Sequence, residues 1–363
     1  MRVLYFTEGD SPHDRRFLRA LSGTPHDVYA LRQKECFPAT PSGIIELDWP
    51  GGQPDWRYWG GWQQAMVSFQ KILDEIQPDV VHAGPIQGPA LLTALSGFQN
   101  LVTMSWGSDI LARAQRSPWM RCATKYVLDH TKVFLGDCQT VIEAAKAYGF
   151  PEKRSLRFPW GVDLEHFSPQ NGKAAGEELR RNLGWEDKFI VLCNRSWYPI
   201  YGVDVLAKAF VASTAENNEL RLMLVGGGPQ SDYIHNILAP VEDRVHFPGW
   251  VDQARLPGVY CGADLFVSPS HCDGSSISLL EALACGRPVL VSDIPSNKEW
   301  IKPGETGELF SDGDPFALTE NILLMAGDSD LACYGENARS LAEVQADWDL
   351  NFKILLQAYH MAL

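Results

Sequence analysis

Short apolar segments alternate with amphipathic helical segments along most of this chain, and this alternation limits the folds it can adopt. Residues 2–7 (RVLYFT), 100–105 (NLVTMS) and 220–226 (LRLMLVG) are apolar at nearly every position, as expected of strands buried on both faces. Residues 61–76 (GWQQAMVSFQKILDEI) instead repeat apolar residues at the helical period. The pattern predicts an α/β protein with parallel sheets and crossover helices.

The strand-like segments fall into two groups separated by a turn-rich and then charged stretch, residues 158–185. The expected strands of the first group are residues 2–7, 79–84, 100–105 and 132–136. Those of the second group are residues 188–194, 220–226, 244–249, 263–268 and 287–293. We place a linker near residues 165–175, so that residues 1–165 and 175–344 form two domains. A single eight-stranded barrel fits less well, because charge and composition change at this linker.

The formal net charge of −14 is distributed unevenly along the chain. Residues 1–165 carry 17 Lys and Arg against 18 Asp and Glu, whereas the remainder carries 14 against 27. Binding to nucleic-acid phosphates needs a basic face, so this acidic balance argues against a nucleic-acid partner. One local basic and aromatic stretch stands out in the first half, and it is either a solvated helix face or a contact with an anionic acceptor or membrane surface: Arg113, Arg116, Trp119, Arg121 and Lys125.

Cysteine spacing and hydropathy limit the cellular setting and the cofactors. The eight cysteines are scattered without a C-x-x-C pair, and several lie in apolar runs, so we interpret them as core residues and expect neither a disulfide framework nor a metal site. The N-terminus lacks the apolar core of a signal peptide, and no stretch of 18 apolar residues could span a membrane. We therefore expect a cytoplasmic protein.

One carboxylate, Glu281, lies within an apolar helical segment. Ser275 or Ser276 is a suitable N-cap, and Gly286 followed by Pro288 ends the helix, which predicts a helix over residues 277–285. Glu281 falls on the apolar side of this helix, where an unpaired charge would cost several kcal/mol. Its carboxylate must therefore meet a protein partner, water in a cleft or a ligand.

The loops after the expected strands contain glycines and polar side chains suited to ligand binding. Ligands bind at the carboxyl ends of strands in open α/β sheets, so two such domains would place a cleft between these ends. The dinucleotide pattern G-x-G-x-x-G is absent from these loops, which argues against a nicotinamide enzyme. The loop residues of interest are Gly9, His13, Arg16, His82, Gln87, Trp106, Asp109 and Arg195.

Taken together, several segments in this order resemble glycosyltransferase family 4, whose members are retaining nucleotide-sugar enzymes of GT-B fold. The resemblance covers nearly the whole chain. It rests on residues 78–84 (PDVVHAG), 105–110 (SWGSDI), 158–169 (FPWGVDLEHFSP), 222–229 (LMLVGGGP), 245–251 (VHFPGWV) and, above all, 273–293 (DGSSISLLEALACGRPVLVSD). The last segment is similar to the family's acidic-x7-Glu motif, with Asp273 and Glu281 in the acidic positions.

The resemblance implies a GT-B fold, in which two Rossmann-like doubly wound domains face each other across a cleft. It also implies that the C-terminal helix, about residues 345–363, crosses back to the first domain. The activity implied is transfer of a sugar from a nucleoside-diphosphate sugar to a hydroxyl of a glycan, lipid or small-molecule acceptor. No cofactor or metal is implied.

The same resemblance assigns roles to residues of the second domain. Glu281 would accept hydrogen bonds from the donor ribose, and Asp273 would hold hydroxyls of the donor sugar. The start of the helix and the Arg195 guanidinium would bind the diphosphate. Further donor-side residues are Gly9, Tyr201, Phe247, Gly249, Trp250, Gly274, Ser275, Ser276, Ile277 and Ser278, with residues 247–250 next to the base.

Three positions depart from the family pattern. Asp273 is one methylene shorter than the usual Glu, Tyr201 stands where a Lys is usual, and Trp106 stands where many members carry a His. The acceptor-side work therefore has no assigned residue. The candidates are His13, Arg16, His82, Gln87, Trp106 and, as a possible catalytic group, Asp109.

The mechanism implied is retention of anomeric configuration without an assured protein nucleophile. The leaving phosphate itself would take the acceptor proton, while Arg195 and the helix N-terminus stabilise its charge. Domain closure would bring the two substrates together. Two other function classes stay open, a catalytically weak nucleotide-sugar-binding partner subunit and a GT-B sugar-nucleotide epimerase.

Overall fold

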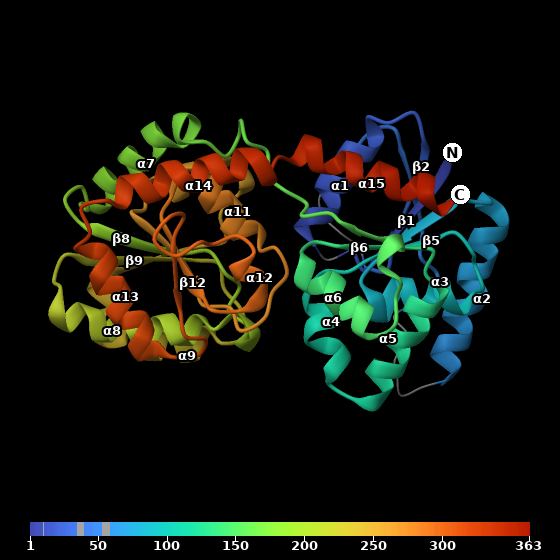
Figure 1. The fold of residues 1–363 in the computed structure, drawn as a ribbon, viewed down its shortest axis with the longest axis horizontal. Helices are drawn as coiled ribbons and strands as arrows, with labels where there is room; N and C mark the ends of the chain where they lie inside the picture. Colours follow the sequence, from blue (N-terminus) through green and yellow to red (C-terminus); the bar gives the residue numbers. More distant parts are fainter. Residues whose placement is uncertain (10, 35–39, 53–58) are drawn as a thin grey trace. The chain divides into compact units, whose positions relative to one another are not determined.

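The protein forms two compact α/β units, as seen in a computed structural model that describes residues 1–9, 11–34, 40–52 and 59–363. The first unit comprises Met1–Phe158 and Phe352–Leu363, and the second comprises Pro159–Asn351. Each unit contains one parallel β-sheet with helices on both faces (Figure 1). The prediction of two Rossmann-like, doubly wound domains is confirmed, and the alternative of a single barrel is wrong because the strands form two separate sheets.

The first unit has a sheet of seven strands in the order β3-β2-β1-β4-β5-β6-β7. The strands are β1 (Arg2–Thr7), β2 (Asp27–Arg32), β3 (Ile44–Leu47), β4 (Val80–Ala83), β5 (Leu101–Met104), β6 (Val133–Gly136) and β7 (Ser155–Arg157). The helical segments are α1 (Pro12–Ser22), α2 (Trp59–Ile76), η1 (Ile86–Ala90), α3 (Leu91–Leu95), α4 (Ser108–Leu111), η2 (Arg113–Gln115), α5 (Pro118–His130), α6 (Gln139–Ala147) and η3 (Glu152–Arg154). The last helix, α15 (Trp348–Ala362), begins in the second unit and ends in the first.

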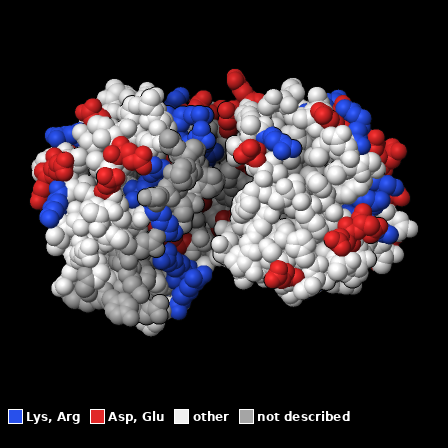
Figure 2. Space-filling view, turned by 180° about the vertical axis from the view of Figure 1, so that it is seen from behind, with Lys and Arg blue, Asp and Glu red and all other residues white. Residues whose placement is uncertain are grey.

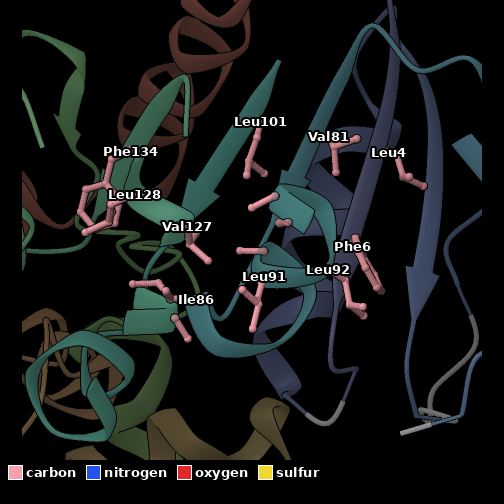
Figure 3. Close-up of a cluster of buried hydrophobic side chains, with 14 of the residues drawn as sticks. Leu4, Phe6, Val81, Ile86, Leu91, Leu92, Leu101, Val127, Leu128 and Phe134 are labelled. Atoms are coloured by element: carbon pink, nitrogen blue, oxygen red, sulfur yellow. The ribbon is translucent and has the colours of Figure 1, made fainter. Parts of the chain in front are cut away.

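The core of the first unit is built from strands that are buried on both faces. Every residue of β4, β5 and β6 is buried, as the apolar runs predicted. Figure 3 shows one face of this core, where Phe6 of β1 and Val81 of β4 pack with Leu92 of α3 and Val127 of α5. This packing holds the loops at the carboxyl ends of the strands in place.

The second unit has a sheet of six strands in the order β10-β9-β8-β11-β12-β13. The strands are β8 (Phe189–Cys193), β9 (Leu220–Val225), β10 (Val245–Gly249), β11 (Leu265–Ser268), β12 (Val289–Ser292) and β13 (Glu308–Phe310). The helical segments are α7 (Pro169–Leu183), η4 (Pro199–Tyr201), α8 (Val203–Glu216), α9 (Ser231–Leu238), η5 (Ala239–Arg244), η6 (Gln253–Arg255), α10 (Leu256–Cys261), α11 (Ile277–Ala284), α12 (Pro295–Lys298), α13 (Pro315–Ala326) and α14 (Leu331–Gln345).

Alternate residues of the central strands of this sheet face two different hydrophobic clusters. Leu192 of β8 and Phe266 of β11 belong to the cluster that includes residues of α10, α11 and α14. Val191 and Val267 belong to the opposite cluster, which includes residues of α8, α9 and α13. Because both faces are buried, the strands have the apolar composition from which they were predicted.

The boundary between the units differs from the linker expected near residues 165–175. Val162 donates a backbone hydrogen bond to Ala346 (2.7 Å), and Arg339 donates to the carbonyls of Leu164 (3.2 Å) and Phe167 (2.8 Å). These bonds tie residues 162–167 to α14 of the second unit. The chain consequently passes between units at Phe158 and Pro159, and again at Asn351 and Phe352.

Among the described residues, no helix is long and apolar enough to cross a membrane.

Candidate functional site

The loops after β8 and β11 bring Arg195 and Asp273 together. Arg195 Nη2 donates to Asp273 Oδ2 at 2.5 Å, and only 11% and 16% of the two side chains are exposed. Arg195 Nη1 also donates to Ser276 Oγ (2.7 Å) and Ser278 Oγ (3.0 Å) at the start of α11. The guanidinium is thus held beside the helix N-terminus, where both the charge and the backbone amides favour an anion.

Tyr201 holds the Arg195 guanidinium from the other side. The guanidinium carbon lies 4.3 Å from the centre of the Tyr201 ring, within the range of a cation–π contact. Burial raises the pKa of the Tyr201 phenol, so the ring is neutral at physiological pH. Tyr201 therefore orients the cation without adding a second positive charge.

Asp273 is the acidic group of this cluster. Burial raises the pKa of the Asp273 carboxyl, while the Arg195 cation and the backbone N–H of Gly274 act in the opposite direction. A buried carboxylate of this kind depends on its cation, because an unpaired charge is costly in a low-dielectric environment.

Glu281 lies on α11 and is 4% exposed, as the helical pattern predicted. Its two oxygens have protein partners: Tyr260 Oη donates to Oε2 (2.8 Å), and Gln253 Nε2 donates to Oε1 (2.9 Å). Asn194 Nδ2 in turn donates to Tyr260 Oη (3.1 Å). Of the three kinds of partner expected for this carboxylate, the structure shows protein donors.

The segment from Gly274 to Ser278 forms the turn into α11. Ser276 is the N-cap by position, but its hydroxyl accepts from Arg195 and makes no side-chain cap bond. Ser275 Oγ accepts from Trp300 Nε1 at 3.1 Å, and Ile277 is half-buried. The structure therefore brings residues 274–278 beside Arg195 and Asp273 at the carboxyl ends of β8 and β11. These five residues are Gly274, Ser275, Ser276, Ile277 and Ser278.

The expected base-side residues lie at the end of β10 and differ from one another in exposure. The Phe247 ring packs against His235, with ring centres 4.3 Å apart, and belongs to the partly buried rim of a core cluster. Gly249 has a φ of +69°, and its carbonyl accepts from Gly226 N (2.8 Å). Trp250 is 76% exposed, so it is the aromatic side chain of this segment that a ligand can reach.

In the first unit, Gly9 is required by the neighbouring strand. It has a φ of +83°, and a Cβ here would lie 2.8 Å from Arg32 Cβ and 2.9 Å from Lys34 O. We expected Gly9 to allow close approach of a ligand, but the closest atoms that a side chain would meet belong to the protein. Next to it, Glu8 lies between two cations, 3.6 Å from Arg113 and 3.8 Å from Lys34.

Asp109 and Gln87 link loops inside the first unit. Asp109 is 4% exposed; Oδ1 accepts from Ser105 Oγ (2.5 Å) and the Trp106 amide (3.1 Å), and Oδ2 accepts from the Ile86 amide (2.9 Å). Gln87 is fully buried, and its Nε2 donates to the Asp109 carbonyl at 2.9 Å. Burial raises the pKa of Asp109. These contacts show that Asp109 links the loops, and its catalytic role stays a prediction.

His82 is also an interior residue. It is fully buried, its Nδ1 lies 2.8 Å from Tyr359 Oη of α15, and its ring contacts Tyr5 edge-on. We expected His82 on the acceptor side, but β4 directs it into the core, where it helps to attach α15. Of the other expected acceptor-side residues, His13, Arg16 and Trp106 are half-buried.

The sequence predicted few of the side chains that contact the candidate site residues. Tyr260 and Gln253, which hold Glu281, precede it by 21 and 28 residues and are not part of any pattern around it. Glu8, which pairs with Arg113, was also not predicted, although a carboxylate directly after the first strand is a recognisable candidate for a site residue. In the described ranges there is no group of three or more His, Cys, Asp or Glu that could hold a metal ion.

Two family models match this chain and cover both units. Residues 2–138 match a model described as Glycosyl transferase 4-like, and residues 187–328 match one described as Glycosyl transferases group 1. The chain belongs to the family 4-like glycosyltransferases. The resemblance found in the sequence is thus confirmed.

Curated proteins that are similar to this chain are also glycosyltransferases. The chain is 30% identical over 213 residues to D-inositol 3-phosphate glycosyltransferase 2 of Catenulispora acidiphila, covering 55% of this chain and 49% of the relative. It is 27% identical over 297 residues to the GDP-mannose-dependent alpha-(1-6)-phosphatidylinositol monomannoside mannosyltransferase of Mycobacterium tuberculosis H37Rv, covering 78% and 76%. The matches to the first relatives span about half of their length.

Solved structures share the fold of this chain. Anabaena HepE in complex with UDP superposes with a TM-score of 0.79 at 18% identity, covering 98% of this chain and 99% of HepE. Sucrose-phosphate synthase of Thermosynechococcus elongatus gives a TM-score of 0.80 at 20% identity, covering 99% and 98%. These likenesses confirm the GT-B fold.

The buried His82 gives this protein a defined pH dependence of stability. Burial lowers the pKa of His82 to about 3, whereas an exposed imidazole has a pKa of about 6.5. Between these pKa values the unfolded chain binds a proton at His82 that the folded protein does not bind. The contribution of His82 to the stability of the folded protein is therefore complete above about pH 6.5 and falls as the pH is lowered. The expected slope is about 1.4 kcal/mol per pH unit.

We expect His82→Gln to flatten the fall in unfolding free energy between pH 6.5 and pH 4.5. In this range the unfolded chain binds a proton at the His82 imidazole and the folded protein does not. Denaturant unfolding followed by tryptophan fluorescence measures the effect. His130→Gln, at an exposed position on α5, is the matched control and should leave the slope unchanged. Equal slopes for wild type and His82→Gln would show that His82 does not titrate in this way.

Proposed function

We propose that this protein transfers a sugar, with retention of anomeric configuration, from a nucleoside-diphosphate sugar to a hydroxyl of a glycan, lipid or small-molecule acceptor. The observation that carries the proposal is the Arg195 guanidinium, held by Tyr201 and Asp273 against the hydroxyls at the start of α11. A cation at a helix N-terminus is suited to a diphosphate. Family membership and relatives that use GDP-mannose support the same reading.

The donor lies, in this proposal, along the carboxyl edge of the second sheet. Trp250, with Phe247 and Gly249, contacts the base; Glu281 accepts from the ribose; and residues 274–278 with Arg195 and Tyr201 hold the diphosphate. Asp273 binds hydroxyls of the donor sugar. Glu281 fits its role because each carboxylate oxygen can accept more than one hydrogen bond, so its protein partners leave capacity for a ligand.

The leaving diphosphate is stabilised by the chain itself in this mechanism, and we propose that no metal is needed. As the bond between the sugar and the phosphate breaks, negative charge grows on the phosphate oxygens beside Arg195 and the α11 N-terminus. The phosphate oxygen takes the proton from the acceptor hydroxyl, and the acceptor oxygen bonds to the anomeric carbon on the face that the phosphate leaves, which gives retention. Arg195 needs no reorientation during this step, since Tyr201, Ser276 and Ser278 already hold it.

A catalytically weak nucleotide-sugar-binding subunit is the second candidate. It is favoured by one observation: Arg195 is already paired with Asp273 and is accompanied by Tyr201 where a second cation is usual. Incubation with nucleotide sugars and product analysis separates the cases, since the enzyme transfers a sugar to an acceptor, the binding subunit leaves the donor unchanged and an epimerase isomerises it.

A thermal-shift panel of UDP, GDP, ADP and their sugars tests donor binding directly. We expect one nucleotide and its sugar to raise the melting temperature, because a ligand that binds only the folded protein adds RT ln(1 + [L]/Kd) to its stability, about 2.7 kcal/mol at 100 times Kd. The corresponding nucleoside, which lacks the diphosphate, is the control and should give little shift. No shift with any nucleotide at millimolar concentration would contradict the proposed donor site.

We also propose a cytoplasmic location with peripheral contact to an anionic membrane surface through residues 113–125. Seven described cysteines are free thiols, which fits a reducing compartment. In this segment Trp119 is 54% exposed, and Arg116 and Arg121 are exposed, whereas Arg113 pairs with Glu8 and Lys125 with Asp129. Figure 2 shows Lys and Arg side chains gathered in a band on the first unit, in the left half of the view.

Co-sedimentation with vesicles tests this contact. We expect the double variant Arg116→Glu, Arg121→Glu to lose most of its binding to vesicles rich in phosphatidylglycerol at low salt, since each surface cation contributes about 1 kcal/mol. Arg181→Glu, at an exposed site of the second unit, is the charge-matched control. Unchanged binding of the double variant would rule out this surface.

A further inference from the structure

Glu281 is held by two side chains that differ in burial. Tyr260 is fully buried and donates to Oε2 at 2.8 Å. Gln253 is exposed and donates to Oε1 at 2.9 Å. Asn194 supports Tyr260, so one side of the carboxylate is fixed from within the core. The other side is held by a side chain that solvent, and therefore a ligand, can reach.

The backbone around Gln253 places its side chain beside Glu281. It begins η6, which directly follows the β10 loop that carries Trp250. Its carbonyl accepts from His166 Nε2 at 2.9 Å, which anchors this turn to the segment before α7. The Gln253 side chain thus extends from an anchored backbone towards Glu281.

The amide of Gln253 has the hydrogen-bonding groups that a vicinal diol requires. A primary amide carries two N–H donors and a carbonyl acceptor, and the bond to Glu281 uses one donor. A diol brings two O–H donors close together, so one can donate to Glu281 Oε1 and the other to the Gln253 carbonyl. The contact with Glu281 is the stronger of the two, because its acceptor is a carboxylate.

The surrounding residues indicate which diol fits. Asn194, which supports Tyr260, is adjacent to Arg195, whose guanidinium lies at the phosphate end of the proposed donor. Trp250, three residues before Gln253 in the turn after β10, is 76% exposed. A cation, a diol-binding pair and an exposed aromatic on these segments match the phosphate, ribose and base of a nucleotide.

We infer that Gln253 is a second ribose-reading residue and that, together with Glu281, it selects ribonucleotides over deoxyribonucleotides. This inference rests on the proposed donor site and adds to it a residue that determines specificity. Gln253 lies outside the acidic-x7-Glu segment, and its place beside Glu281 follows from the fold.

Calorimetric titration of the full chain with UDP, GDP and ADP, each compared with its 2′-deoxy form, tests the inference. The readout is the ratio of the two dissociation constants, which a residue that merely stabilises the fold would not change. We expect the wild type to prefer the ribonucleotide and Gln253→Leu to reduce this preference about three- to tenfold, the effect of one lost hydrogen bond. Gln253→Asn, which shortens the reach by one methylene, should reduce it as well. Gln170→Leu, at an exposed glutamine of α7, is the matched control.

The outcomes separate this inference from the proposed function. If the wild type binds none of UDP, GDP and ADP at millimolar concentration, the donor site itself is wrong and the inference falls with it. If the wild type binds a ribonucleotide preferentially and Gln253→Leu and Gln253→Asn keep that preference, the donor site stands and the inference is overturned. A wild type that binds both sugar forms equally also overturns it.

Discussion

Replacing Arg195 with alanine is expected to lower turnover at least a hundredfold. This corresponds to about 2.7 kcal/mol of transition-state stabilisation at 1.36 kcal/mol per tenfold. The physical reason is that the Arg195 cation is held at the start of α11 by Tyr201, Ser276 and Ser278, while Tyr201 adds no charge of its own. The remaining stabilisation from the helix N-terminus, at most about 2 kcal/mol when partly buried, cannot replace it.

Arg195→Lys separates charge from geometry in this prediction. Lysine restores a positive charge but cannot reproduce the planar contacts with Asp273 and the two serine hydroxyls, so we expect only partial recovery. Arg181→Ala, at an exposed arginine of α7, is the matched control and should leave turnover unchanged. Because Arg195→Ala leaves Asp273 without its cation, thermal denaturation must show that the variant is folded. A folded variant that keeps more than a tenth of the wild-type turnover would place the phosphate elsewhere.

Replacing Glu281 with glutamine is expected to weaken nucleotide binding about tenfold or more, the loss for hydrogen bonds to a charged acceptor. The effect has two sources. The ribose hydroxyls lose a carboxylate acceptor, and the new amide group places N–H donors against Tyr260 or Gln253, which already donate to this side chain. Titration with the nucleotide selected by the thermal-shift panel measures the change.

The comparison variant for Glu281 is Tyr260→Phe, which keeps the carboxylate and removes one of its supports. We expect Tyr260→Phe to weaken binding less than Glu281→Gln, since the carboxylate still accepts from Gln253 and from the ribose. Binding by Glu281→Gln within twofold of the wild type, in a protein that melts cooperatively, would show that the ribose does not contact Glu281.

Most strands that could be predicted from the sequence are buried on both faces, and the half-buried edge strand β10 is the exception. Residues 100–105 and 220–226, for example, contain β5 and β9, because burial on both faces demands an unbroken apolar run. The strands that were not predicted, β2, β3, β7 and β13, include polar residues or are only three or four residues long. Three of these four are the edge strands β3, β7 and β13. An edge strand needs less apolar surface, so its pattern is weaker.

The helix carrying Glu281 was predicted over residues 277–285 and is observed over Ile277–Ala284. Local chemistry sufficed there, because Gly286 has a φ of +63° and Pro288 follows it. The partners of Glu281 could not be predicted, since Tyr260 and Gln253 reach it only through the packing of α10 and η6 beside α11.

The burial of His82 and Asp109 was missed for the same reason. Both residues lie at or just beyond strand ends, where polar side chains often face a ligand. Here His82 is paired with Tyr359 from the far end of the chain, and Asp109 with the backbone amide of Ile86, 23 residues before it. Such pairings depend on the tertiary fold and leave no local pattern.

The proposed function depends most on where a nucleoside diphosphate binds, and a crystal structure of the full chain with the nucleotide selected by the thermal-shift panel tests this directly. We predict that the phosphates lie within hydrogen-bonding distance of Arg195 and the backbone amides of residues 274–278, with the ribose on Glu281 and Gln253. A nucleotide bound with its phosphates away from Arg195 and α11 would contradict the account.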